Sequence, residues 1–289
     1  MSSLLDPDSA DLSLLQDRQV VVLGYDALAA AHALNLRDSG VDVRVGIDPD
    51  SRGAGRAEVD GLMVMTPDEA VATCDIVVLA TEGSRVPGLS DEDVRRLLEE
   101  HTEPGDMVVV TSGADLVEVP EGVDLAMLAA VGDGARVREE YLDGRGSPAL
   151  VAVAHDGSGA AWATLTAYAA AMGSLRSGAL VTTVERQVLA REHAEQRVHR
   201  PLQRALEEAF EELVGQGVED EVAYLALVHD LKSRVDEIYV AGFAAQHGPD
   251  GQPGDQPLDG ARSRREAARA AHPMERVGQR VRAMMSWIR

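Results

Sequence analysis

Residues 20–40, VVVLGYDALAAAHALNLRDSG, constrain the fold more than any other stretch of this sequence. The apolar run before Gly24 predicts a buried strand, and the alanine-rich run that ends at Gly40 predicts a helix. A strand, a glycine turn and a helix in this order open the dinucleotide-binding fold. Of the three glycines in the G-x-G-x-x-G loop of that fold only the first is present, because Asp26 and Ala29 replace the other two.

Strand and helix patterns alternate through the N-terminal part of the chain. Helical patterns lie at 90–101 and 159–173. This alternation, with short turns, is typical of a parallel, doubly wound α/β sheet. We therefore predict a Rossmann-type dinucleotide-binding domain over residues 1–182. Its further strands are expected at 41–47, 74–81, 106–112, 123–130 and 149–156.

The remainder of the chain has a helical pattern throughout. Two long helical segments are separated by the polar stretch 215–220, and the second has a broad apolar face. A face of that width indicates burial against another helix, in this chain or in a partner. Residues 247–262 are rich in Pro, Gly and Asp, as flexible linkers are. We predict an all-helical domain over 183–289, shortened by this linker, and a homodimer formed through it.

The composition limits the partners and the compartment. A formal charge of −22 argues against nucleic acid, whose phosphates attract basic surfaces. The single cysteine, Cys74, excludes an internal disulfide, and neither a basic leader nor a run of about 18 apolar residues is present. We expect a cytoplasmic protein with no membrane or nucleic-acid partner. Its acidity has two open explanations, a GC-rich genome or a salt-rich cytoplasm, and Lys232 as the only lysine favours the first.

Several longer segments resemble one enzyme family in order and approximate spacing. They are AHALNLRDSGVDVRVG at 31–46, VREEYLDGRGSPALVAVAHDGSG at 137–159, AYLALVHDLKSRVDEIYVAG at 223–242 and the closing MMSWIR at 284–289. On these segments the sequence resembles the short class of ketol-acid reductoisomerases. The resemblance implies a Rossmann domain followed by a knotted, helical dimerisation domain. It also implies NADPH, magnesium and the conversion of acetohydroxy acids to dihydroxy acids in branched-chain amino-acid synthesis.

The resemblance places the pyrophosphate-binding loop of the cofactor at Gly24, Tyr25 and Asp26. Asp26 brings a carboxylate to the place where the two phosphates meet backbone amides, which weakens cofactor binding. The alternative is that Asp26 caps the following helix, where an aspartate is favourable. Both interpretations make this loop the remnant of a cofactor site.

The second cofactor loop follows the strand at 41–47. The family grips the 2′-phosphate of NADPH there, and here the loop contains Asp48, Ser51 and Arg52, with Arg56 nearby. An acidic residue after this strand favours a free ribose hydroxyl, and hence NADH over NADPH. The alternative is an exposed polar turn. Binding of NADP or NAD therefore remains possible, but the replacements argue against it.

The catalytic positions implied by the resemblance no longer carry proton-transfer side chains. The histidine of one family loop corresponds to Ser112, and the lysine and histidine of another correspond to Val131 and Ala135. No general acid or base is left on either loop.

The metal-binding positions are half lost. Glu195 and Asp230 match two of the four family carboxylates, whereas Arg191 and Ala226 replace the other two. A guanidinium in such a cluster repels divalent cations, so magnesium is not expected. A rebuilt zinc or iron site would draw on these two carboxylates and on His193, His199 and His229, although histidines on charged helices are usually surface residues.

These replacements lie where chemistry needs the residues, while scaffold segments stay close to the family. We predict a ketol-acid reductoisomerase-like protein that has lost the parent activity and acts as a binding or regulatory homologue. It would form a homodimer or pair with an intact homologue. Two alternatives remain, a repurposed NAD(P)-dependent reductase that needs no metal and a genuine ketol-acid reductoisomerase.

Overall fold

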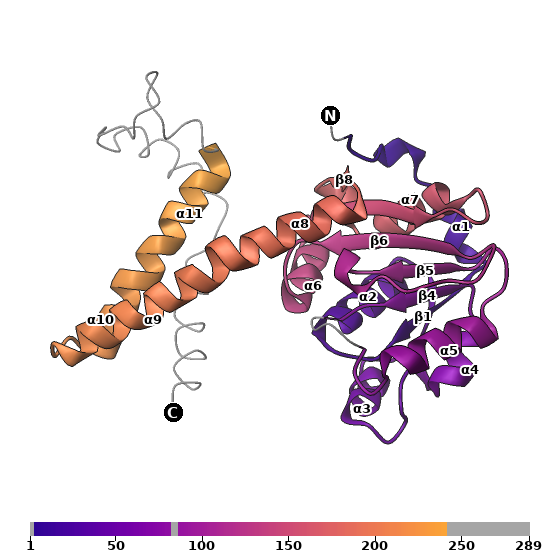
Figure 1. The fold of residues 1–289 in the computed structure, drawn as a ribbon, viewed down its shortest axis with the longest axis horizontal. Helices are drawn as coiled ribbons and strands as arrows, with labels where there is room; N and C mark the ends of the chain where they lie inside the picture. The colour runs from indigo at the N-terminus through magenta and orange to yellow at the C-terminus, as the bar shows by residue number, and fades with distance from the viewer. Residues whose placement is uncertain (1–2, 82–85, 242–289) are drawn as a thin grey trace. The chain divides into compact units, whose positions relative to one another are not determined.

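A computed structural model describes residues 3–81 and 86–241 of the chain (Figure 1). It divides into two compact units, Met1–Arg200 and Pro201–Arg289. The first unit contains one eight-stranded sheet of order β3-β2-β1-β4-β5-β6-β7-β8. The strands are β1 Gln19–Leu23, β2 Asp42–Gly46, β3 Met63–Met65, β4 Ile76–Leu79, β5 Met107–Val110, β6 Asp124–Ala130, β7 Ala149–His155 and β8 Ala179–Val181.

The predicted α/β fold is confirmed, with one difference in the sheet. Seven strand pairs connect the eight strands, and only β6 and β7 run antiparallel. The sheet is therefore parallel except at this pair. The reason lies in the chain that precedes β7, which returns to the end of β6 and not to its start: the backbone N–H of Val131 donates to the carbonyl of Pro148 at 2.8 Å. A strand that begins beside the end of its neighbour must run in the opposite direction.

Helices cover both faces of the sheet, as Figure 1 shows. Alternate strand residues point to opposite faces, so Val20 and Val22 pack in one core while Val21 and Leu23 pack in the other. The first core receives apolar side chains from α2, α3, α6 and α7, the second from α4, α5 and α8. These helices are α2 Ala27–Asp38, α3 Arg52–Val59, α4 Pro67–Val71, α5 Asp91–His101, α6 Gly134–Leu142, α7 Ala161–Ala171 and α8 Val184–Ala194, after a short α1 at Ser13–Gln16.

Short 3₁₀ turns complete the first unit at Pro7–Ser9, Gly113–Asp115 and Ser174–Arg176. Several of its elements had no sequence prediction, namely β3, β8, α3, α4 and α6. Each is short, and most contain too few apolar residues to show a clear period.

The helical patterns of the C-terminal part are confirmed, including the break near 215–220. Helix α8 continues through a π-helical turn at Glu195–His199 into α9, Arg200–Gly215. After the break, α10 Asp220–Tyr224 continues through a π-helical turn at Leu225–His229 into α11, Asp230–Ala241. The predicted domain boundary at residue 182 stays a prediction. The expected linker at 247–262 and the MMSWIR segment lie outside the described residues.

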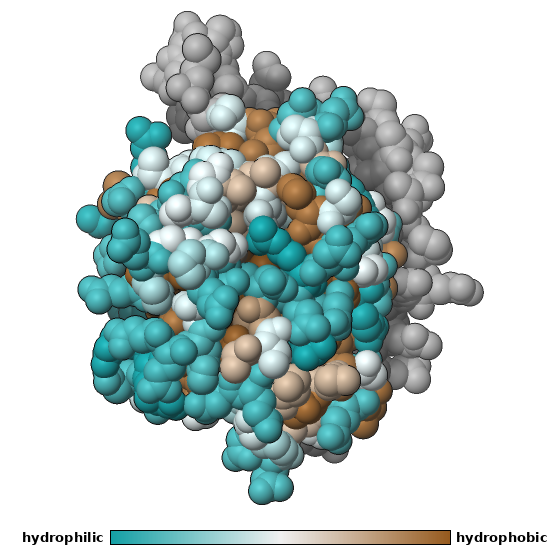
Figure 2. Space-filling model, turned by 90° about the vertical axis from the view of Figure 1, so that its right-hand side faces the viewer, coloured by the Kyte–Doolittle hydropathy of each residue, from teal (hydrophilic) through white to brown (hydrophobic). Residues whose placement is uncertain are grey.

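The surface is strongly polar. On the face drawn in Figure 2 hydrophilic residues predominate, and exposed hydrophobic residues gather in limited areas. Within the described residues no helix combines the length and the apolar character needed to cross a membrane.

Candidate functional site

A cavity of about 350 Å³ lies where the carboxyl ends of β1 and β2 meet the starts of α2 and α3. In doubly wound sheets, ligands bind outside the carboxyl ends of the strands. Of the six residues that the sequence assigns to a cofactor, four line this cavity and two, Gly24 and Arg52, do not. The lining residues are Tyr25, Asp26, Gly46, Ile47, Asp48, Ser51, Gly53, Arg56, Pro67, Pro87, Gly88 and Leu89.

Gly24 makes the turn that leads from β1 to this edge. Its φ of +78° is a left-handed conformation that favours glycine, and its N–H donates to the carbonyl of Gly46 at 2.9 Å. The first glycine of the loop is therefore kept for a backbone reason, whether or not a ligand binds.

Asp26 caps helix α2. Its Oδ1 accepts a hydrogen bond from the backbone N–H of Ala29 at 2.9 Å, and its backbone is extended, as at an N-cap. The capping interpretation of Asp26 therefore holds in the structure. The helix terminus, which in this fold presents amides to a pyrophosphate, carries its own negative charge.

The start of α6 packs against the start of α2. A Cβ placed on Gly134 would lie 2.1 Å from the carbonyl carbon and 2.2 Å from the carbonyl oxygen of Ala27. Asp133 caps α6 by accepting from the N–H of Arg136 at 2.8 Å. Two helix termini thus meet, each with its own aspartate cap. This arrangement does not fit a pyrophosphate, because an anion at the start of α2 would face capping carboxylates and a tightly packed backbone.

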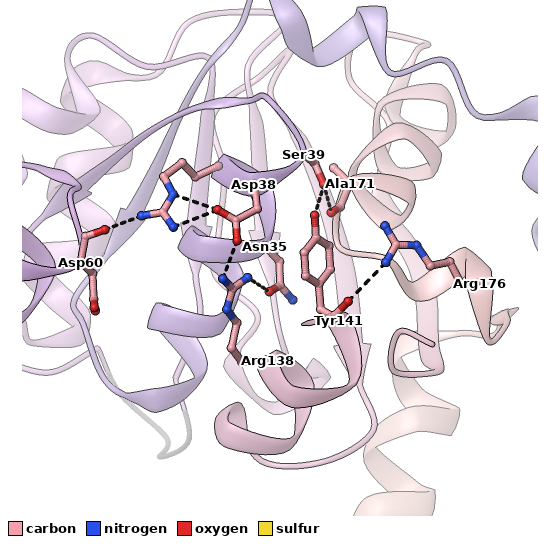
Figure 3. Close-up of polar contacts among 9 residues, drawn as sticks. Asn35, Asp38, Ser39, Asp60, Arg138, Tyr141, Ala171 and Arg176 are labelled. Carbon is pink, nitrogen blue, oxygen red and sulfur yellow. Dashed lines mark hydrogen bonds and ion pairs between the residues drawn. The ribbon is translucent and has the colours of Figure 1, made fainter. Parts of the chain in front are cut away.

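Polar contacts at the other ends of these helices hold them in place (Figure 3). Arg138 of α6 donates to Oδ1 of Asn35 at 2.8 Å and pairs with Asp38, both on α2. The hydroxyl of Ser39 lies 2.8 Å from that of Tyr141 and donates to the α7 carbonyl of Ala171 at 2.6 Å. The Arg176 guanidinium lies 4.9 Å from the centre of the Tyr141 ring. These contacts fix α6 along α2, and with it the position of Gly134. Nothing local in the sequence indicates this contact of Gly134, because it joins residues far apart in the chain.

Tyr25 and Arg56 build the floor of the cavity. The Tyr25 side chain is buried and its hydroxyl donates to Oδ2 of Asp60 at 2.7 Å. Burial and this carboxylate raise the pKa of Tyr25, so it is a neutral donor and not a proton acceptor. Arg56 donates from Nη2 to the backbone carbonyl of Tyr25 at 2.7 Å, which places its guanidinium at the cavity wall.

The loop after β2 presents Asp48 and Ser51. Asp48 is exposed and its Oδ1 accepts from the N–H of Asp50 at 3.0 Å. Ser51 accepts from the N–H of Ala54 at 3.2 Å and so caps α3. Arg52, the first residue of α3, is exposed outside the cavity. An acidic residue after the second strand is the arrangement that accepts a ribose hydroxyl.

The three positions that the resemblance assigns to catalysis are Ser112, Val131 and Ala135. Ser112 is 2 % exposed and its hydroxyl accepts from the N–H of Ala114 at 3.2 Å. The loop is sealed by α8, because Gly113 donates to Oε1 of Gln187 at 3.0 Å. Val131 and Ala135 are exposed on the loop and helix after β6.

Arg191 faces a carboxyl of the first unit. Burial raises the pKa of Asp115, and the Arg191 guanidinium opposes that rise. The position of a family metal ligand is thus occupied by a cation with an acidic neighbour.

The two carboxylates that the resemblance assigns to the metal site contact basic side chains on their own helices. Oε1 of Glu195 lies 3.0 Å from Nε of Arg200 and Oε2 lies 3.1 Å from Nδ1 of His199. Arg200 and His199 lower the pKa of Glu195. In the second unit Asp230 pairs with Arg234 at 2.8 Å, and Ala226 lies in the π-helical turn before it.

Of the proposed zinc or iron ligands, the described part of the chain brings only Glu195 and His199 into contact. Three other potential metal ligands do lie close together in the described part of the chain, namely Asp68, Glu100 and His101. Nη1 of Arg96 lies 3.0 Å from both of its carboxylates and occupies the position of a cation.

Comparisons with known proteins agree with this fold. Residues 14–178 match the family model of the acetohydroxy acid isomeroreductase NADPH-binding domain. The chain is 39 % identical over 251 residues to the ketol-acid reductoisomerase (NADP(+)) of Beutenbergia cavernae, covering 85 % of this chain and 72 % of that protein. For the enzyme of Kocuria rhizophila the identity is 38 % with the same coverage.

Solved structures give the same result. An NADH-preferring ketol-acid reductoisomerase from an uncultured archaean superposes with a TM-score of 0.72 at 30 % identity, covering 84 % of this chain and 75 % of that one. A semialdehyde dehydrogenase NAD-binding protein from Cupriavidus necator shares the fold alone, with a TM-score of 0.57 at 17 % identity over 90 % of this chain and 93 % of that one. The resemblance found in the sequence is confirmed, and the chain belongs to the ketol-acid reductoisomerase family.

Proposed function

We propose that this member of the family no longer catalyses isomeroreduction and acts as a binding or regulatory homologue. The observation that carries the proposal is the capped start of α2, where Asp26 accepts from Ala29 and Gly134 packs on Ala27. A cofactor whose pyrophosphate meets carboxylates in place of amides loses its main anchor.

The other parts of the site support the same conclusion. The isomerisation needs a metal ion to polarise the substrate, and the position of one ligand is occupied by Arg191. Proton transfer needs a titratable group, and Ser112, Val131 and Ala135 supply none at neutral pH. The residues proposed for cofactor binding, for metal binding and for proton transfer all differ from those of the family, as expected when the reaction is no longer performed.

A metal-independent NAD(P)-dependent reductase is the second candidate. Asp48 favours it, because its carboxylate follows β2 at the place where a ribose hydroxyl is accepted, and the cavity beside it is preserved. This alternative needs a hydride donor to bind in spite of Asp26. The third possibility, a genuine reductoisomerase, needs the magnesium site as well.

The protein is proposed to be cytoplasmic and to act as a homodimer or together with an intact homologue. Large apolar side chains of the C-terminal helices support an association through this region, since each is at least 38 % exposed in the single chain. They are Leu189, Val198, Leu202, Val222, Leu225 and Val235.

Turnover of 2-acetolactate tests the proposal. The purified full chain is mixed with substrate, magnesium and either NADPH or NADH, and nicotinamide absorbance is followed, with the Kocuria rhizophila enzyme as a positive control. We expect no oxidation above the rate without protein. Magnesium-dependent oxidation would establish a genuine reductoisomerase, and metal-independent oxidation of NADH with any ketone would establish the second candidate.

A further inference from the structure

The cavity beside Asp48 extends to Asp26 at the capped start of α2. We infer that it binds an adenosine-type nucleoside with a free ribose diol and no phosphate group. This deepens the proposed function and rests on it in one respect, namely that a dinucleotide does not occupy the cavity.

The charges of the cavity select against phosphate. Its charged lining residues are Asp26, Asp48 and Arg56, so two carboxylates oppose one guanidinium. One arm of that guanidinium is used by the fold, since Nη2 of Arg56 donates to the carbonyl of Tyr25 at 2.7 Å. A phosphate next to two carboxylates is repelled, whereas an uncharged nucleoside is not.

Asp48 offers an acceptor for a diol. Its Oδ1 takes the N–H of Asp50 at 3.0 Å, and within the described residues no hydrogen bond is made by Oδ2. A carboxylate oxygen at the end of the second strand is in the position that accepts a ribose hydroxyl, and charge-assisted hydrogen bonds of this kind are strong. A 2′-phosphate in the same place would be repelled by the negative charge of this carboxylate.

The remaining walls suit a flat aromatic base. Ile47, Pro67, Pro87 and Leu89 give the cavity an apolar side. Gly53 lets α3 approach this apolar side closely, because a Cβ there would lie 2.6 Å from Cδ1 of Ile47. At about 350 Å³ the cavity is near the lower end of the range of about 300–1,000 Å³ seen for ligand pockets, a size that suits one nucleoside better than a dinucleotide.

The test compares adenosine, its 5′- and 2′-monophosphates and NADH as ligands of the full chain by isothermal titration calorimetry. We expect adenosine to bind at least about tenfold more tightly than either monophosphate or NADH. The Asp48→Asn variant should weaken adenosine by about tenfold, because it removes the charge that strengthens the hydrogen bond to the diol. Asp50→Asn is the matched control, an exposed carboxylate in the same turn that does not line the cavity, and should leave the affinity unchanged.

A second variant isolates the phosphate selectivity. Asp26→Ser keeps a side chain that caps α2 and removes the negative charge, so it should raise the affinity for the 5′-monophosphate while adenosine changes little. Equal or tighter binding of NADH or of either monophosphate by the unmodified protein would overturn the inference. So would the absence of adenosine binding up to about 5 mM, or equal effects of Asp48→Asn and Asp50→Asn. Failure here leaves the proposed loss of reductoisomerase activity standing, because that is measured separately by 2-acetolactate turnover.

Discussion

The carboxylate of Asp26 accepts the backbone N–H of Ala29 at 2.9 Å, at the end of a helix where this fold ordinarily receives a pyrophosphate. One side chain thereby does two things. It satisfies an amide at the start of α2 and places a negative charge where this fold ordinarily receives phosphates. The first effect stabilises the fold, and the second weakens the binding of a cofactor.

The cap makes a measurable contribution to stability. Asp26→Ala should lower the free energy of unfolding by about 1 kcal/mol, since the amide of Ala29 loses its acceptor. Asp26→Ser should change it by a few tenths of that amount, because a serine hydroxyl can accept the same bond. Urea denaturation followed by circular dichroism measures both. An Asp26→Ala variant as stable as the unmodified protein would show that the carboxylate has no capping role.

The contact between α6 and α2 admits no side chain at its closest point. Gly134→Ala should destabilise the protein by about 3 kcal/mol or prevent folding, because the added Cβ would lie 2.1 Å from the backbone of Ala27. Gly55→Ala in α3 is the control, since nothing lies within 4 Å of a Cβ there, and it should stabilise by up to about 1 kcal/mol. Soluble yield and urea denaturation are the measurements. Similar stability of the two variants would contradict the packing described here.

Acid should weaken the fold through a buried histidine. Nδ1 of His32 lies 2.7 Å from the hydroxyl of Tyr168, and both residues are fully buried. Burial lowers the pKa of His32 from 6.5 to about 4, against a smaller opposing effect of the Asp26 charge. The unfolded chain therefore takes up a proton that the folded chain refuses, and stability falls as the pH drops from 6.5 towards 4, by up to about 3 kcal/mol.

The contribution of His32 is separated by two variants. His32→Gln should reduce the slope of stability against pH in this window, while Tyr168→Phe should retain it because the histidine still titrates. Urea denaturation at several pH values gives the slopes. An unchanged slope in His32→Gln would assign the acid sensitivity to other groups.

The formal charge of −22 predicts a response to salt. If the surface is adapted to a salt-rich cytoplasm, raising KCl should raise the melting temperature steeply, because screening reduces the repulsion among carboxylates. Sodium sulfate, which also strengthens apolar burial, is compared at equal ionic strength to separate the two effects. A melting temperature that rises little between low and high KCl would favour genome composition as the origin of the acidity.

The sequence was sufficient for those parts of the fold in which the pattern is local. The strands from β1 to β7, apart from the short β3, are apolar or alternating runs bounded by turns, and α2 at Ala27–Asp38 lies within the predicted helical run that ends at Gly40. The direction of β7 was missed because it depends on where the chain returns after α6, which Val131 and Pro148 show only in three dimensions.

The replaced residues of the candidate site could be recognised from the sequence, whereas most of the contacts that these and neighbouring residues make could not. Asp26 could be interpreted as a cap or as a repulsive charge from its position alone, and both interpretations describe the same carboxylate. The packing of Gly134 on Ala27 joins residues far apart in sequence. Arg56 was noted only as an available cation, because its bond to the carbonyl of Tyr25 requires the helix α3 that the sequence did not reveal.

The most direct test of the account is a titration of the folded full chain with NADPH and with NADH at low and high salt, followed by nicotinamide fluorescence. Two salt conditions are needed because an acidic protein can depend on screening to fold. We expect no saturable binding of either dinucleotide up to about 1 mM, whatever the salt. Binding of either at micromolar concentration would contradict it, because the start of α2 would then accept a pyrophosphate in spite of Asp26.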